Sequence, residues 1–148
     1  MKMSGKAALL GAYGTNVGSP SGLDGPGIAM WSSPRDLAVI FRAAMANPVF
    51  AQITTQPTTV FPTKTGDKVL VNQDELLKRY PGTLGGKTGF TDLAQKTFVG
   101  AADRNGRRLV IALMFGMDKP GGPTYWDQAA SLLDWGFALD PNASVGSL

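Results

Sequence analysis

The dipeptide Asn105-Gly106 constrains the fold of this chain more than any other short feature, because it lies between two apolar runs. Both residues of such a pair readily adopt the left-handed backbone that a two-residue hairpin turn requires. The runs at 96–102 and 108–115 are therefore predicted to be antiparallel strands. The glycine-rich stretch 85–91, just before them, is predicted to be extended, which completes a three-stranded antiparallel meander.

The last of these strands is apolar on both of its faces. Val110, Ala112 and Met114 alternate with Leu109, Ile111, Leu113 and Phe115. A strand of this kind is usually covered on both sides, so helices are expected to pack with the sheet. The chain is accordingly predicted to have the α+β fold class, with helices first, then the meander, then a helix lying on the sheet.

Two helices have clear start signals. Ser33 offers an N-cap before Pro34, and an amphipathic helix is predicted from there to Asn47-Pro48. Thr124 can cap a last helix that ends near Phe137. Weaker signals predict a helix end at 6–12, a loop at 14–27, short extended pieces or a small hairpin at 53–71, and a capping box of Asn72 with Glu75 that opens a short helix to Tyr80. Residues 1–139 are taken as one domain portion and 140–148 as a tail.

Two absences restrict the chemistry. The 148 residues include no cysteine and no histidine. A thiol nucleophile, a disulfide framework, a Ser-His-Asp triad and a histidine-ligated zinc site are therefore excluded. A hydrolase built from this chain would need a lysine or a carboxylate as its general base.

Charge and hydropathy give little evidence for a nucleic-acid or membrane partner. The net charge is +3, and the densest basic cluster is Arg104, Arg107 and Arg108 around the predicted hairpin turn. No aromatic residues interleave with it, so a solvated hairpin tip is favoured over nucleic-acid binding. No segment reaches the ~20 apolar residues that span a bilayer. The apolar run 7–10 is too short for a signal peptide.

The tripeptide Lys-Thr-Gly occurs at 64–66 and again at 87–89. The second copy leads into two predicted strands, whereas the first lies in a proline-rich, turn-like setting, so the second is the functional candidate. Gly86-Lys87-Thr88 also resembles the end of a phosphate loop. That motif needs a glycine where Pro81 stands and a helix afterwards, so it is rejected.

The second copy has the groups of a carboxylate clamp. The ammonium of Lys87 and the hydroxyl of Thr88 can bind a carboxylate, and Gly85, Gly86 and Gly89 let a ligand backbone approach closely. An edge N–H can bond an extended peptide or point at a developing oxyanion. The simpler alternative is that Lys87 is an exposed lysine that protects an edge strand from aggregation.

The stretch Gly85 to Thr91, followed by a strand, by Asp103 to Gly106 and by Arg107 to Ile111, resembles the K-T-G region of serine D-alanyl-D-alanine carboxypeptidases. These are penicillin-binding proteins, related to the β-lactamases. Further segments match in the same order: Met3 with Lys6-Ala7 and Leu10-Gly11, the loop Ser19 to Asp24, the helix start Ser33 to Ala38, and Asn72 to Leu77. The resemblance implies the C-terminal portion of a β-lactamase/transpeptidase-like fold.

The resemblance also implies roles for particular residues. Lys87 and Thr88, with Gly89, would bind the terminal carboxylate of a peptidoglycan stem peptide or of a β-lactam. The backbone N–H of Phe90 would be one oxyanion-hole donor. No metal or cofactor is implied. The sequence departs from the family's pattern at Gln95, where glycine is usual, and at Ser19, where asparagine is usual.

The family's nucleophile and base, in S-x-x-K, and its S-x-N motif do not occur in this chain. No catalytic residue is therefore expected here. The chain is interpreted as a hydrolase fragment, inactive alone, of a protein that works outside the cytoplasmic membrane. In the family's fold further strands lie beside the strand 108–115, so self-association or strand swapping through an open sheet edge is expected. The alternatives are a serine β-lactamase relative, a non-catalytic peptidoglycan-binding module, and a chain that folds only with its missing part.

Overall fold

The computed structural model describes residues 2–116 and 120–143 and confirms the α+β fold class. The elements, in chain order, are α1 (Lys2–Leu9), α2 (Pro34–Met45), α3 (Pro48–Thr54), β1 (Thr58–Thr63), β2 (Gly66–Val71), α4 (Leu76–Arg79), β3 (Thr83–Thr91), β4 (Gln95–Arg104), β5 (Arg107–Gly116) and α5 (Tyr125–Ala138). Residues 144–148 of the expected tail lie outside the described part.

The predicted meander is present. The three strands pair antiparallel in the order β3-β4-β5, and Arg104 lies opposite Arg107 across the turn. Asn105 and Gly106 have φ angles of 57° and 81°. Both are left-handed, as a type I′ hairpin turn requires. The turn chemistry of two residues therefore sets the register of β4 against β5.

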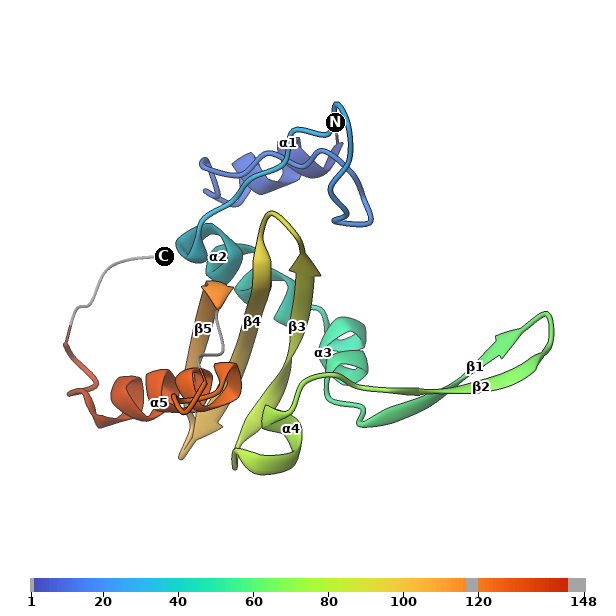
Figure 1. Cartoon of the computed structure of the whole chain (residues 1–148). Coiled ribbons are helices and arrows are strands. Elements are labelled where there is room, and N and C mark those ends of the chain that lie inside the picture. The colour runs from blue at the N-terminus through green and yellow to red at the C-terminus, as the bar shows by residue number, and fades with distance from the viewer. Residues whose placement is uncertain (1, 117–119, 144–148) are drawn as a thin grey trace.

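Helices cover both faces of this sheet, as the apolar pattern of β5 predicts (Figure 1). On the α5 side, Phe98 and Ile111 join Ala129 and Leu133 in one buried cluster. On the α2 side, Phe41 packs with Val99 and Ala101, and Val110 and Ala112 lie against that group. Burying an aliphatic or aromatic side chain of this size contributes about 1.5–3 kcal/mol. The two clusters fix β4 and β5, and β4 in turn positions β3.

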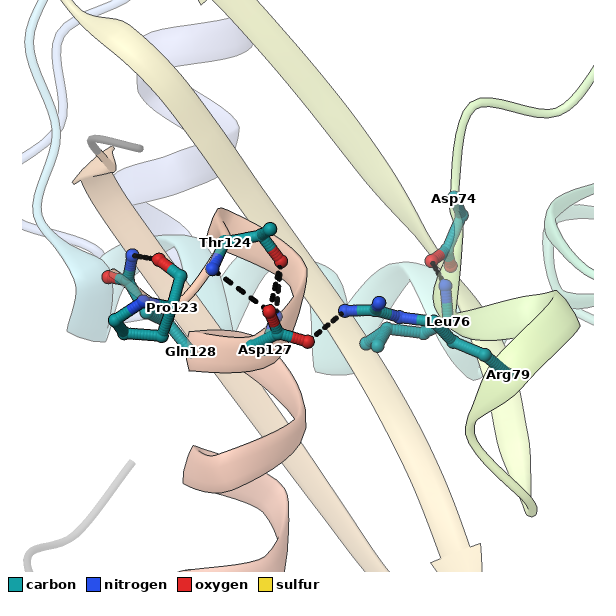
Figure 2. Close-up of polar contacts among 7 residues, drawn as sticks. All are labelled: Asp74, Leu76, Arg79, Pro123, Thr124, Asp127 and Gln128. Carbon is teal, nitrogen blue, oxygen red and sulfur yellow. Dashed lines mark hydrogen bonds and ion pairs between the residues drawn. The ribbon is translucent and has the colours of Figure 1, made fainter. Parts of the chain in front are cut away.

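The helix caps follow the sequence signals at two of three places. Ser33 Oγ accepts a hydrogen bond from Asp36 N and opens α2. Thr124 and Asp127 form a reciprocal capping box at the start of α5. Asp127 also pairs with Arg79 of α4, 3.0 Å away, which connects α5 to the segment before β3 (Figure 2).

The capping box predicted for Asn72 with Glu75 is wrong. Asn72 Oδ1 accepts from Asp74 N, and Asp74 Oδ1 accepts from Leu76 N, so consecutive side chains bend the chain into α4. Glu75 instead pairs with Lys78 on the exposed surface. Asp and Asn side chains bond their own backbone two residues on, and this local pattern replaced the expected cap.

The segment after Asn47 was not predicted to be helical. Asn47-Pro48 does end α2, but Asn47 Oδ1 also accepts from Val49 N and Phe50 N and starts α3. The expected small hairpin follows as β1 and β2, with a two-residue turn at 64–65. Among the described helices, none alone is long and apolar enough to cross a membrane. Only α2 and α3 together reach that length and composition, as a pair bent by 110°.

Candidate functional site

The second Lys-Thr-Gly copy lies on β3, at the edge of the three-stranded sheet. Lys87 lies opposite Val99 and Thr88 opposite Phe98, so the two side chains leave the strand on different faces. The Lys87 side chain is exposed, and its Nζ donates to the carbonyl oxygen of Thr88. In the described part of the chain, no other strand pairs with the outer edge of β3. This edge of β3 is therefore not occupied by a strand of the described chain.

Glycine is required at the start of this strand. A Cβ on Gly85, where φ is +103°, would lie 2.6 Å from the carbonyl oxygen of Thr54 at the end of α3. A Cβ on Gly86 would lie 2.5 Å from the Phe98 ring. Both distances are shorter than real Cβ contacts, so β3 packs against α3 and Phe98 only because side chains are missing there.

Gln73 is a residue of this site that the sequence did not predict. Its Oε1 accepts a hydrogen bond from Thr88 Oγ1 at 3.3 Å. Gln73 lies in the connector between β2 and α4, and neighbouring Asn72 anchors that connector by donating Nδ2 to the carbonyl oxygens of Thr54 and Gln56. Asn72 and Asp74 are the sequence signal that could have predicted a turn stabilised by side-chain hydrogen bonds here.

Asp74 belongs to the same connector and is 1% exposed. Its Oδ1 accepts from Leu76 N at 3.0 Å, whereas no described residue bonds its Oδ2. Burial raises the pKa of the Asp74 carboxyl to about 6, and the Leu76 hydrogen bond opposes this shift. A buried carboxyl with one free oxygen favours its protonated form.

The turn after Phe90 connects the strand to the loop before α2. Thr91 Oγ1 accepts from Ala94 N, and Asp24 Oδ2 accepts from Leu93 N at 3.3 Å. Gln95 has a φ of 55°, a left-handed conformation that glycine adopts readily. The sequence departure at this position therefore places a non-glycine residue in a strained, left-handed backbone conformation.

The other sequence candidates lie apart from this strand. Lys64 occupies the turn between β1 and β2 and is exposed. The chain continues as a strand beyond Thr88, which agrees with the rejection of a phosphate loop. Within residues 2–116 and 120–143, no group of three acidic or metal-binding side chains could hold a metal ion.

The meander with helices on both faces matches part of the fold of solved penicillin-binding peptidases. The structure aligns with a D-alanyl-D-alanine carboxypeptidase from Mycobacterium tuberculosis H37Rv at a TM-score of 0.94 and 68% identity, over 99% of this chain and 56% of that one. It aligns with the Streptomyces K15 DD-transpeptidase at a TM-score of 0.79 and 31% identity, over 93% of this chain and 53% of that one. The fold class is thus that of the DD-peptidases.

Sequence comparison identifies the family. A profile of the D-alanyl-D-alanine carboxypeptidase family, peptidase S11, matches residues 1–118, and the chain belongs to this family. D-alanyl-D-alanine carboxypeptidase DacB2 of M. tuberculosis is 68% identical over 147 residues, which cover 99% of this chain and 50% of that protein. DacF of Bacillus subtilis is 31% identical over 138 residues, 93% of this chain and 34% of that protein. The chain spans half or less of these relatives.

Proposed function

We propose that this chain contributes the substrate-carboxylate clamp of a serine-type D-alanyl-D-alanine carboxypeptidase. The observation that carries the proposal is the position of Lys87 and Thr88 on the open edge of β3, with glycines on either side. The ammonium and the hydroxyl leave opposite faces of β3, so they would bind the terminal carboxylate of a stem peptide from its two sides at the strand edge, and Gly89 would allow close approach. Phe90 N–H would donate to the developing oxyanion.

The covalent step needs groups that this chain does not contain. In the complete enzyme a serine would attack the penultimate D-alanine carbonyl, free D-alanine would leave, and water would hydrolyse the acyl-enzyme. No serine of the sequence has a lysine three residues on, so neither the nucleophile nor its base is supplied here. We expect the chain alone to bind and not to turn over substrate.

A β-lactam is the second ligand class for the same clamp, because it presents a carboxylate beside a reactive carbonyl. A penicillin-binding protein D2 from Listeria monocytogenes, solved in its cefotaxime-bound form, aligns at a TM-score of 0.76 and 30% identity. Because peptidoglycan lies outside the cytoplasmic membrane, we propose that the complete protein works there. The absence of the serine motif also keeps a non-catalytic peptidoglycan-binding module as a second candidate.

Intact-mass measurement after incubation with a penicillin tests the proposal that this chain does not supply the nucleophile. We expect the mass of the chain to remain unchanged. A stoichiometric penicilloyl adduct would show that a serine in this chain is an activated nucleophile, and the proposal of missing chemistry would then be wrong.

The outer edge of β5 supports a proposal about assembly. It pairs with no further strand in the described part of the chain, although β5 is apolar on both faces. We expect self-association or strand swapping through this edge. A sedimentation run that shows a clean, stable monomer would contradict it.

A further inference from the structure

The ribbon of β1 and β2 projects away from the rest of the molecule (Figure 1). Every residue of both six-residue strands is exposed, and in the described structure these strands pair only with each other. An isolated two-stranded ribbon is marginally stable in water, and contiguous exposed apolar residues mark an interaction surface. These two properties predict that the ribbon binds a partner.

The apolar residues occupy the middle of the ribbon. Val60 lies directly opposite Val69 on one face, beside Val71, and these side chains are 61%, 62% and 60% exposed. Phe61 and Leu70 lie on the other face and are also exposed. The charged residues, Lys64, Asp67 and Lys68, gather at the tip. A charged tip and open backbone edges disfavour insertion into lipid hydrocarbon.

The two outer edges of the ribbon are not equivalent. Asn72 N donates to the Pro57 carbonyl oxygen at 2.8 Å, which makes this opposite pair a hydrogen-bonded one. Because bonded and non-bonded pairs alternate, Pro62 of β1 and Val69 and Val71 of β2 direct their backbone outward. Pro62 has no N–H, so the β1 edge is interrupted. The β2 edge keeps its donors.

We propose that the outer edge of β2 pairs antiparallel with the same edge of a second copy of this chain. A two-fold axis at Leu70 places Val69 of each copy opposite Val71 of the other, and Leu70 opposite Leu70. Val60, Val69 and Val71 of the other copy then form one cross-strand row of β-branched neighbours, and the two-fold axis generates a second such row beside it.

The register centred on Leu70 is favoured over the two registers that lie closer to the tip. Centring the pair on Val69 would place the Asp67 carboxylate opposite the apolar Val71 of the other copy. With the axis at Leu70, Lys68 lies opposite the neutral Asn72 of the other copy. Centring the pair on Lys68 would place two ammonium groups face to face, which is unfavourable for directly opposite residues in a sheet. This contact is separate from the β5 edge, so the two can be tested independently.

The chain contains no cysteine, so one introduced thiol reports on one contact. We would compare Leu70→Cys, on the proposed axis, with Val60→Cys on β1, where the native side chain is the more exposed of the two, at 61% against 40%. Paired strands hold the two introduced thiols on the axis within disulfide range, so Leu70→Cys should cross-link to itself at least about tenfold faster than Val60→Cys. Val69→Lys in the Leu70→Cys background should abolish the difference, and Val60→Lys should not.

Equal cross-linking rates for the two single-cysteine variants would overturn the proposal, since random collision gives that result. So would a Leu70→Cys rate that Val69→Lys leaves unchanged. The ribbon is outside both buried clusters, so these substitutions leave the core intact, and circular dichroism would confirm the fold of each variant. The β5 edge cannot produce the predicted difference.

Discussion

Thr88 Oγ1 on the edge strand donates a hydrogen bond to Gln73 Oε1, 3.3 Å away in the connector before α4. The next residue of that connector is Asp74, whose carboxyl is buried and lacks a partner for one oxygen. The proposed clamp threonine is thus held by a segment that also carries a buried titratable group. Stability and clamp geometry are expected to respond to the same carboxyl.

Asp74→Asn should change how stability depends on pH. The folded pKa of about 6 lies above the ordinary value of 3.8, so the stability contributed by the protonated carboxyl is complete below pH 3.8 and is lost as pH rises through 6. The loss amounts to about 3 kcal/mol, because each pKa unit corresponds to about 1.4 kcal/mol. The variant cannot ionise and should escape this loss.

Urea unfolding at pH 4.5 and pH 7.5 measures the effect. The stability of Asp74→Asn relative to the unmodified chain should rise between the two values. Asp67→Asn, at an exposed position on β2, is the matched control and should show no such rise. Parallel pH profiles for the unmodified chain and Asp74→Asn would contradict the assignment.

Gln95→Gly should stabilise the chain. The residue has a φ of 55°, and glycine has no steric cost in the left-handed region. A gain of about 0.5–1 kcal/mol is expected, reduced by the lost bond from Gln95 Nε2 to the Asp92 carbonyl oxygen. Gln95→Ala loses that bond and keeps the strain, so its urea midpoint should fall. If Gln95→Gly and Gln95→Ala had equal urea midpoints, backbone strain at position 95 would not contribute to stability.

Gly86→Ala should destabilise the chain by about 1–3 kcal/mol, because overpacking a filled core forces neighbours to shift. The added methyl group would meet the Phe98 ring at 2.5 Å. Gly5→Ala, at an exposed position of α1, is the control, because the added methyl group meets nothing within 4 Å. Alanine favours a helix over glycine, so this variant should be more stable by about 0.5–1 kcal/mol. A thermal or urea melt that moves in the same direction for both variants would refute the packing argument.

The parts of the fold that follow from local chemistry were predictable. Asn105-Gly106 specifies its turn by backbone conformation alone, and the apolar faces of β5 predict two covering layers. Helix α3 was missed because Asn47-Pro48 both ends α2 and begins α3. The same residue pair is a sequence signal for a helix end and for a helix start, and only the first was predicted.

The candidate site was only partly predictable. Lys87 and Thr88 came from a motif and its setting, and their roles remain predictions. Gln73 meets Thr88 across 15 residues, and the burial of Asp74 depends on the packing of α4. No periodicity or spacing in the sequence predicts the Gln73–Thr88 contact or the burial of Asp74, because both arise only when the chain folds.

The most direct test of the carboxylate clamp is an NMR titration of the labelled chain with N-acetyl-D-alanyl-D-alanine and with its C-terminal amide. The account predicts shifts at residues 86–90 for the acid and none for the amide. Lys87→Ala should weaken binding about tenfold or more, as expected for a lost hydrogen bond to a charged group. Lys64→Ala, in the other Lys-Thr-Gly copy, should bind as the unmodified chain does. Equal binding of acid and amide, or equal effects of the two lysine substitutions, would contradict the clamp.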